Sequence, residues 1–453
     1  MVQRKFVINQ HIRCDLNTAN DSSREFMQLK KCMNEKAISL APIETVSVYV
    51  HIPYCRSICS YCDFFRTKTT DPEHDFPPLL KRIIEEASYY RQQIPQAKIR
   101  SIYIGGGTPS SIPLHQLQQF LPQLLDSLQI SQEKITNNSI EWTIEANPED
   151  ISTDFLRVIK NAGVNRLSIG VQTSDNDLLH SLNRRSSGQT LISSLEITAK
   201  NWNMENISLD FISGIPRQTK KHLDNDISCI RELRPGHISL YSLSLEEGSK
   251  MFPLVMDGTI QLPDQDKLWE HMHSNLKRLG YQHYEISNYC RDQRYAKHNN
   301  YYWQMHPYIG IGPGAVGTLP ILFGNKRIPS RMYSAPFFED WANTKIEKIT
   351  SMDLLKDYCI TGFRTKSGVH LEAIQSVFGS IGSQLISNAI QKQQENFELY
   401  TKNSFRFVRC TEKALMLLDG ILQQLFLSFE SDEIHTALPD NPVWPPESHY
   451  YFH

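Results

Sequence analysis

Three cysteines lie close together in the segment HIPYCRSICSYCDFF (51–65). Their spacing, C-x3-C-x2-C, places Cys55, Cys59 and Cys62 in one loop. Thiolates are soft ligands that suit zinc or an iron–sulfur cluster. A structural zinc site needs a fourth ligand, and His51 is poorly placed to supply it because it belongs to the preceding strand. The spacing therefore favours a [4Fe–4S] cluster with three cysteine ligands and one iron left open for a substrate.

Six short runs of β-branched and aromatic residues begin just before this loop, and segments with helical periodicity separate them. The runs are VSVYVHI (46–52), KIRSIYIGG (98–106), IEWTIEA (140–146), NRLSIGV (165–171), NISLDFI (206–212) and HISLYSL (237–243). Strands that alternate with helices predict βαβ units and a parallel sheet. Six such units predict an α/β fold built on a partial (β/α)6 barrel of the TIM type.

Each run continues into a segment with unusual chemistry: PYC, GGGTPS, EANPED, GVQT, DFISGIP and SLSLEEG, in chain order. In parallel barrels the active site is built at the carboxyl ends of the strands, so these six segments are expected to face one mouth. Glycine and proline there could simply punctuate loops. That interpretation does not explain Glu145, Gln172 and Asp210, which lie inside or beside apolar strands.

The pattern changes after about residue 330. Helical stretches are followed by a hairpin at 397–411, predicted to turn at Lys402–Asn403, and by a closing helix at 412–426. This order predicts an α+β domain of winged-helix type. The predicted division is an N-terminal extension (1–44), a core domain (45–330), a C-terminal domain (331–435) and a proline-rich tail (436–453), expected to be poorly ordered or wrapped on the surface.

The composition excludes several classes of protein. The 453 residues carry a net charge of -2, so no global positive field attracts nucleic acid. The nine cysteines are an odd number in a chain too long to need disulfides. Neither a signal peptide nor an apolar run of about 18 residues is found. We expect a cytoplasmic protein with reduced thiols, no nucleic-acid partner and no integral membrane segment.

The three cysteines, with Tyr61 before the last of them and GGGTP at 105–109, resemble the radical S-adenosylmethionine (SAM) superfamily. The resemblance implies that the open iron chelates the amino and carboxylate groups of SAM, and that the reduced cluster cleaves SAM to a 5′-deoxyadenosyl radical. The backbone at Gly106, Gly107 and Thr108 is then expected to receive the ammonium group. Glu145 is expected to accept hydrogen bonds from the ribose.

Further segments are similar to the group that contains coproporphyrinogen dehydrogenase and HemW. They are YVHIPYC, YIGGGTPS, IEANP, RLSIGVQ, LDFISGIP, YEISNY and GIGPGA, between about residues 45 and 425. By matching motif, Tyr49 is expected near the cluster. Gln172, Arg184 and Asp210 match polar positions that contact SAM in the dehydrogenases.

Two features separate the branches of this group. The dehydrogenase has a further cysteine two residues after the third, where this chain has Phe64. The HemW branch has C-D-F at that place and a later H-N-x-x-Y-W motif, and both are present, the second as HNNYYW (298–303). HemW proteins are regarded as chaperones that pass haem to acceptor proteins. The HemW branch is therefore expected, with oxidative decarboxylation of coproporphyrinogen III as the alternative activity.

The HNNYYW motif carries the predicted contact with haem. Imidazole is a common axial ligand of haem iron, and the neighbouring aromatic side chains offer flat apolar surface. The competing interpretation is that His298 is a packed histidine among packed aromatics. The resemblance favours contact between His298 and haem. It also implies haem or porphyrin, haem-acceptor proteins and an electron donor such as flavodoxin or ferredoxin as partners.

Overall fold

The computed structural model describes residues 26–28, 38–137, 139–336, 341–431, 433–447 and 450. Most of the predicted N-terminal extension lies outside these residues. Among the described helices, none is both long and apolar enough to cross a membrane.

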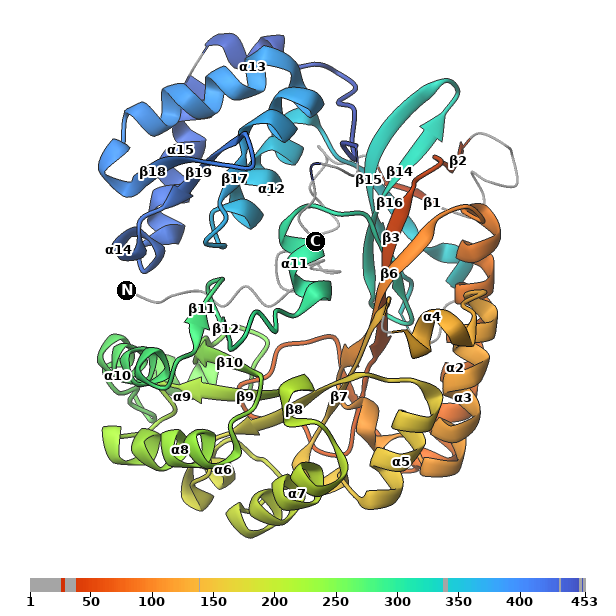
Figure 1. Ribbon diagram of the computed structural model, residues 1–453, viewed down its shortest axis with the longest axis vertical. Coiled ribbons are helices and arrows are strands. Elements are labelled where there is room, and N and C mark those ends of the chain that lie inside the picture. Colours follow the sequence, from red (N-terminus) through yellow and green to blue (C-terminus); the bar gives the residue numbers. More distant parts are fainter. Residues whose placement is uncertain are drawn as a thin grey trace.

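A curved sheet with seven adjacent parallel strands forms the centre of the molecule (Figure 1). Six of them are the strands predicted from the sequence: β3 (Thr45–Ile52), β6 (Lys98–Gly106), β7 (Glu141–Ala146), β8 (Arg166–Gln172), β9 (Ile207–Ser213) and β10 (His237–Ser242). They pair in chain order, as the predicted barrel requires. The seventh, β13 (Tyr308–Ile311), pairs with the outer side of β3 and was missed because it has only four residues.

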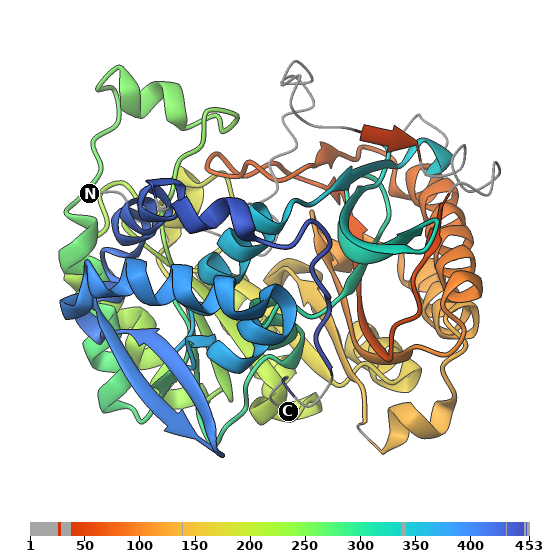
Figure 2. The ribbon, with the colours of Figure 1, turned by 90° about the horizontal axis from the view of Figure 1, so that it is seen from above.

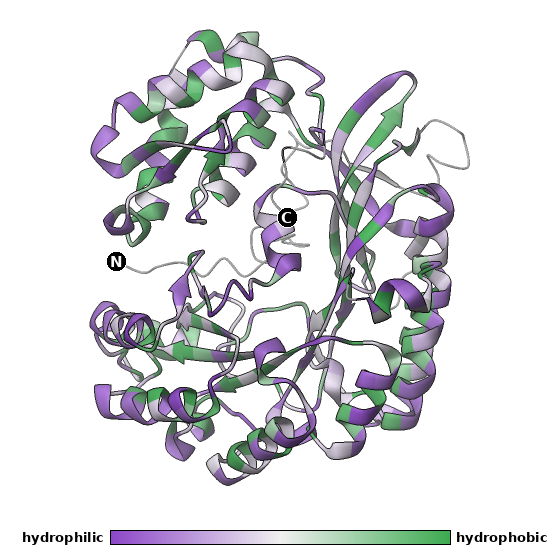
Figure 3. Ribbon diagram, viewed as in Figure 1, coloured by the Kyte–Doolittle hydropathy of each residue, from purple (hydrophilic) through white to green (hydrophobic). Residues whose placement is uncertain are grey.

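Helices cover the convex face of this sheet (Figure 1). In chain order the helices of the core are α2 (Pro72–Gln93), α3 (Leu114–Ser127), α4 (Gln132–Thr136), α5 (Thr153–Ala162), α6 (Asn176–Ser181), α7 (Gly188–Asn201), α8 (Lys220–Leu233), α9 (Phe252–Met256) and α10 (Gln265–Arg278). In β3 the alternate residues Val46, Val48, Val50 and Ile52 join the hydrophobic core. Figure 3 shows that the helices around the sheet also carry apolar segments between polar ones. Burial of these faces drives the helices onto the sheet.

The concave face of the sheet is polar although it is buried. The other alternate residues of β3 are Thr45, Ser47, Tyr49 and His51, and all four are shielded from solvent. A parallel strand is usually apolar on both faces. A polar inner face costs desolvation unless each group is hydrogen-bonded. The sequence of β3 therefore indicates an interior built for polar contacts.

Additional strands extend the sheet on both sides without closing it. They are β1 (Phe26–Gln28), β2 (Ile38–Leu40), β14 (Val316–Phe323), β15 (Lys326–Tyr333) and β16 (Lys345–Lys348) beyond β13, and β11 (Gln282–His283) and β12 (Asn288–Cys290) beyond β10. The core sheet thus continues past residue 330 and includes strands from before residue 45. The proposed division of the chain into four parts stays a prediction.

A smaller unit follows the sheet and faces its open side (Figures 1 and 2). It consists of α12 (Ser351–Gly362), β17 (Val369–His370), α13 (Leu371–Gln391), β18 (Phe397–Lys402), β19 (Phe405–Cys410), α14 (Glu412–Leu415) and α15 (Leu418–Ser431). The predicted α+β order is confirmed. The hairpin turns one residue later than predicted, at Asn403 and Ser404, which both adopt positive φ.

Most residues of the described tail are exposed or half-buried, but one side chain anchors it. Trp444 is fully buried in the core of the C-terminal unit. Its indole Nε1 donates to the carbonyl of Met305, 3.1 Å away, and its own carbonyl accepts from Nε of Arg327 at 3.0 Å. Both partners belong to the region of the central sheet. Trp444 therefore joins the two parts of the molecule.

Candidate functional site

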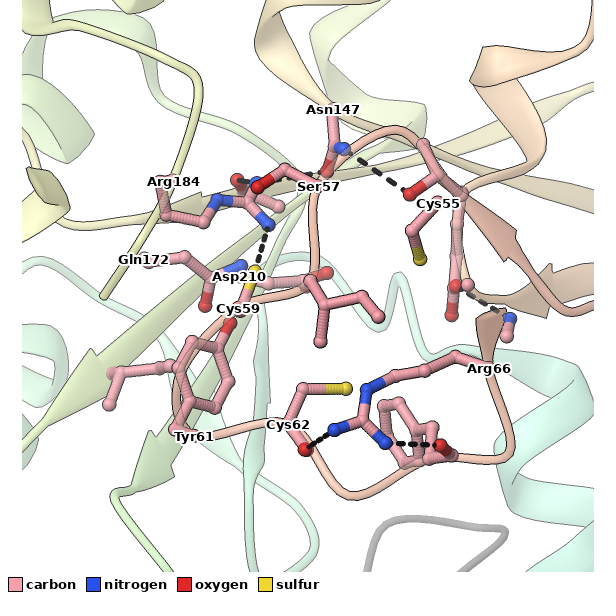
Figure 4. A pocket seen from close by; sticks show the side chains of 18 of the residues that line it. Cys55, Ser57, Cys59, Tyr61, Cys62, Arg66, Asn147, Gln172, Arg184 and Asp210 are labelled. Atoms are coloured by element: carbon pink, nitrogen blue, oxygen red, sulfur yellow. Dashed lines mark hydrogen bonds between the residues drawn. The ribbon is translucent and has the colours of Figure 1, made fainter. Parts of the chain in front are cut away.

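A cavity of about 180 Å³ lies at the carboxyl ends of the parallel strands (Figure 4). Eleven of the thirteen residues predicted for the site line it: Cys55, Cys59, Tyr61, Cys62, Gly106, Gly107, Thr108, Glu145, Gln172, Arg184 and Asp210. Tyr49 and His298 do not. The expectation that strand ends converge on one mouth explains this grouping, because these residues come from six separate segments of the chain.

The cysteine loop is held from three directions by backbone hydrogen bonds. The amide of Ser60 donates to Leu182, its carbonyl accepts from Met251, and the amide of Thr69 donates to Cys55. In Figure 4 the three cysteine side chains point into a common space. Burial raises the pKa of Cys55 and raises that of Cys62 to about 11, so these thiols bind their protons firmly until a cation displaces them.

Two half-buried arginine side chains flank the thiols. Arg184 donates to Sγ of Cys59 at 3.6 Å, and to Asn147 Oδ1 and the carbonyl of Gly170 at 2.9 and 2.8 Å. Arg66 donates to the carbonyls of Phe64 and Cys62. Burial would lower the pKa of Arg184, but the nearby Cys59, Tyr61 and Glu149 raise it above its ordinary value. Arg184 therefore carries a permanent positive charge beside the thiols.

The donor set fits a [4Fe–4S] cluster. Three thiols share one space, and within the described residues Nε of Arg66 and Nε of Arg184 are buried without a hydrogen-bond partner. An unpaired buried N–H is costly, and an anionic cluster or a carboxylate would relieve both. At Gly107 a Cβ atom would lie 2.9 Å from Sγ of Cys55, so only glycine leaves the sulfur its place.

Glu145 lines the cavity near the end of β7. Its carboxylate accepts from the hydroxyl of Tyr103 at 2.6 Å and from the amide of Gly106 at 3.1 Å. Burial raises the pKa of Glu145 to about 7, and the nearby Asp210 contributes in the same direction. Gly106 adopts φ +113°, which allows its amide to face the carboxylate. Glu145 can therefore take up or release a proton near neutral pH.

Asp210 on β9 and Gln172 at the end of β8 also line the cavity. Asp210 accepts from the hydroxyls of Ser168 and Ser208 at 2.9 and 3.1 Å. Gln172 has φ +68°, an uncommon conformation for a residue other than glycine. The carboxylate of Asp226 secures the following turn, because its Oδ1 accepts from both the amide and the hydroxyl of Ser174 at 2.6 Å. Asp226 thus positions Gln172 without touching the cavity.

Tyr49 lies one layer below the cavity, on the inner face of β3. Its ring stacks on Tyr103 with centroids 6.1 Å apart, and its hydroxyl meets Nδ1 of His51 at 2.9 Å. Nε2 of His51 donates to the carbonyl of Phe65 at 2.8 Å. Both ring nitrogens of His51 are therefore occupied, which argues against His51 as the fourth ligand of a zinc site.

His298 lies deeper still, on α11 (Lys297–Trp303), at the opposite end of the strands. Its side chain is shielded, with the residue 3% exposed, and its Nδ1 meets the hydroxyl of Ser101 at 2.9 Å. Gly106 lies five residues after Ser101 on β6, which is about 17 Å along a strand. Burial lowers the pKa of His298 to about 3, so the ring is neutral. The structure does not bring His298 together with the cysteines.

Comparison with known proteins assigns the family. Residues 49–230 match the Radical SAM superfamily. The heme chaperone HemW of Lactococcus lactis is 32% identical over 385 residues, which cover 84% of this chain and 97% of that protein. The chain belongs to the HemW family. The Bacillus subtilis HemW is also 32% identical, over 74% of this chain and 87% of that protein.

The solved structure of the Escherichia coli coproporphyrinogen III oxidase HemN, a radical SAM enzyme, confirms the fold. It superposes with a TM-score of 0.69 over 92% of this chain and 99% of that one, at 16% identity. Membership of the HemW family agrees with Phe64 and with the HNNYYW segment. Sequence reasoning missed Arg66, Asn147 and Tyr241 of the cavity. Asn147 and Tyr241 lie inside segments that were singled out, but nothing local to the sequence shows which of their side chains face the cavity.

Proposed function

We propose that this protein is a haem chaperone that holds a [4Fe–4S] cluster and SAM in the cavity, binds haem and delivers it to acceptor proteins. The observation that supports the proposal most strongly is the match to the Lactococcus lactis heme chaperone over 97% of that protein. The cavity adds independent support. It joins three thiols to two arginine side chains whose buried Nε atoms need an acceptor.

Each side chain of the cavity has a distinct role in this proposal. Cys55, Cys59 and Cys62 would hold the cluster, which supplies one electron and an open iron for the amino and carboxylate groups of SAM. Arg184 would donate to the thiolate of Cys59 and hold it in place. Glu145 and Asp210 offer carboxylate oxygens to the hydroxyl and ammonium groups of the nucleotide.

Haem contact is proposed for α11, and the structure sets a condition on it. The backbone amides of Lys297 and His298 both donate to Glu141, at 3.0 and 2.8 Å. With its ring against Ser101 and Tyr103, His298 can reach haem iron only when α11 moves away from β6 and β7. This movement breaks side-chain contacts but leaves the strand ladder intact.

The test of haem contact is a titration of anaerobically purified protein with haem, followed by the Soret band. We expect His298→Ala to weaken or shift the band. The matched control is His306→Ala, because His306 is an equally buried histidine that instead meets Thr45, 2.7 Å from its Nε2. A band that responds equally to both substitutions, or to neither, removes His298 from the haem site.

Oxidative decarboxylation of coproporphyrinogen III is the less favoured alternative. It shares the barrel and the SAM positions, but Phe64 stands where the dehydrogenases have a further cysteine. Incubation of the protein with coproporphyrinogen III, SAM and a reductant separates the two activities. We expect no protoporphyrinogen. If the porphyrin product accumulates with turnover of SAM, the chaperone proposal must give way to an enzymatic one.

The cluster itself is tested by iron and sulfide analysis of the same sample. We expect about four irons and four sulfides per chain, as a [4Fe–4S] centre requires, and their loss in Cys59→Ala. Colourless protein without iron would refute the proposal as a whole. The cytoplasm as compartment, and flavodoxin or ferredoxin as electron donor, remain part of the proposal, and cell fractionation with an antibody tests the first of them.

A further inference from the structure

A line of hydrogen-bonded side chains leads from Asp210 in the cavity to Tyr284, which follows β11. Oδ1 of Asp210 lies 3.1 Å from Oγ of Ser208, and that Oγ lies 2.8 Å from Nδ1 of His237. Nε2 of His237 in turn lies 2.8 Å from the hydroxyl of Tyr284. Ser208, His237 and Tyr284 are buried. Of the four residues, Asp210 alone lines the cavity.

The hydroxyl of Tyr284 sets the direction of these hydrogen bonds. Among the described residues its polar neighbours are Nε2 of His237 and the backbone amide of Ala296, which donates to it at 3.2 Å. An amide N–H cannot accept, so the hydroxyl hydrogen of Tyr284 goes to Nε2 of His237. Burial lowers the pKa of His237 well below its ordinary value, so the ring is neutral and has one hydrogen. That hydrogen therefore belongs on Nδ1.

The position of the ring hydrogen decides where Ser208 donates. Because Nδ1 of His237 donates to Ser208, the single hydroxyl hydrogen of Ser208 is free for Asp210; Oγ of Ser239 is farther from it, at 3.3 Å. With the ring hydrogen on Nε2 instead, Ser208 would donate to His237, and Asp210 would lose this donor. A hydrogen bond to a carboxylate favours its charged form. Tyr284 therefore supports the charge of Asp210 through two intermediate side chains.

Other groups around this line also bear on the charge of Asp210. Burial raises the pKa of Asp210 above its ordinary value, whereas Arg166 on β8 and the hydroxyl groups of three serines act in the opposite direction. A carboxyl group in such a balance should respond to the loss of one donor. The titratable groups that face Asp210 are Glu145 on β7, Tyr103 on β6 and Tyr241 on β10, and the groups that face His237 or Tyr284 are Arg166, Glu285 and Cys290. Removal of the Tyr284 hydroxyl leaves all of them in the chain.

We propose that Tyr284 and His237 are positioning residues of the SAM site, which keep the carboxylate of Asp210 charged and ready to receive the nucleotide. The inference rests on the proposed function of the cavity. A charged carboxylate can only accept hydrogen bonds, as the hydroxyl and ammonium groups of SAM require, whereas a protonated one must also donate. Neither positioning residue lines the cavity, so both act through Ser208.

The test is binding of SAM to cluster-loaded protein by equilibrium dialysis, from about pH 5.5 to about pH 8. Loss of one donor should raise the pKa of Asp210, so fewer molecules carry the charge at the acid end. We expect Tyr284→Phe to weaken binding about threefold to tenfold at the lowest pH, since one pKa unit corresponds to about tenfold, and to match the wild type at the highest. The ratio of variant to wild-type affinity cancels the contribution of Glu145.

Tyr289→Phe is the matched control. Tyr289 is also buried, and its hydroxyl also meets a histidine at 2.8 Å, but that histidine is His273, outside the line to Asp210. We expect this variant to follow the wild type at every pH. The lost acceptor for the amide of Ala296 costs Tyr284→Phe some stability, and a purely structural loss of that kind would weaken binding alike at all pH values.

Two further variants test the route. Ser208→Ala removes the last donor of the line and should reproduce the weakening at the acid end. In His237→Phe, Ser208 has no ring nitrogen to donate to, so the addition of Tyr284→Phe should have no pH-dependent effect.

The possible failures are distinct. If the wild type binds no SAM at any pH, the proposed function of the cavity fails. If the wild type binds SAM but Tyr284→Phe weakens binding equally at all pH values, or leaves it unchanged, the positioning role is overturned. A pH-dependent effect of Tyr284→Phe that persists without His237 overturns the route through Ser208.

Discussion

Gly107→Ala offers the sharpest test of how the backbone shapes the cysteine cavity. A Cβ atom at this position would lie 2.8 Å from the carbonyl oxygen of Tyr54, 2.9 Å from that of Ile52 and 2.9 Å from Sγ of Cys55. Carbon–oxygen contacts this short cannot persist, and two of the three neighbours are backbone atoms that cannot rotate away. The amide of Gly107 also donates to Ile52 at 2.6 Å, which ties the residue to β3.

The expected cost of this substitution is that of overpacking, about 1–3 kcal/mol. The third neighbour is a proposed cluster ligand, so relief of the clash by movement of the sulfur should also lower iron content. The assay is urea unfolding together with iron analysis of anaerobic protein. Gly420→Ala is the control, because no atom beyond its own helical turn and chain neighbours lies within 4 Å of its Cβ position, and α15 should gain up to about 1 kcal/mol from alanine. Unchanged stability and iron content in Gly107→Ala would refute the steric reasoning.

Three further predictions follow from other contacts. Burial raises the pKa of Asp226 to about 7, so its contribution to stability is full below its unfolded pKa near 3.8 and is lost as the pH rises through 7. Asp226→Asn should therefore raise the urea midpoint more at pH 8 than at pH 5, and an equal change at both values contradicts this. Because the carboxylate form of Glu145 grows as the pH passes about 7, binding of SAM in equilibrium dialysis should strengthen from pH 6 to pH 8, and Glu145→Gln should remove that dependence. Trp444→Ala should cost about 3–5 kcal/mol in urea unfolding, whereas exposed Val443→Ala should stay within about 0.5 kcal/mol.

The sequence predicted the parts of the site that depend on local pattern. C-x3-C-x2-C is a local spacing, and runs of β-branched residues mark the strands. Both the cysteines and the strand ends could therefore be identified from the sequence. Arg66 and Asn147 could not be found in this way, since their roles depend on distances across the fold. For His298 the sequence revealed the motif but not the position of the side chain. Its motif was recognised, but only the fold reveals that the side chain is enclosed between α11 and β6.

In the fold, too, only the elements with a local sequence pattern could be predicted. The six long parallel strands were predicted because each carries enough residues to display a period. Strand β13 has four residues, and its parallel partner β3 precedes it by more than 250 residues, so nothing local marks it. The burial of Trp444 was missed for a similar reason. Proline-rich composition indicates a lack of regular structure, but it does not reveal that one large side chain can enter a core.

The unclosed sheet changes what the interior can accommodate. In a closed barrel the interior diameter is fixed by the number and stagger of the strands. A ligand wider than that diameter could enter only if hydrogen bonds between strands were broken. Here the open side of the sheet is covered by the short helix α11 and by the C-terminal unit that begins at α12. In the proposed function, entry of a tetrapyrrole requires displacement of this helix and this lobe, which breaks side-chain bonds together with the backbone bonds from Ile286 to Arg364 and from Lys366 to Tyr284, while the parallel strands keep their pairing.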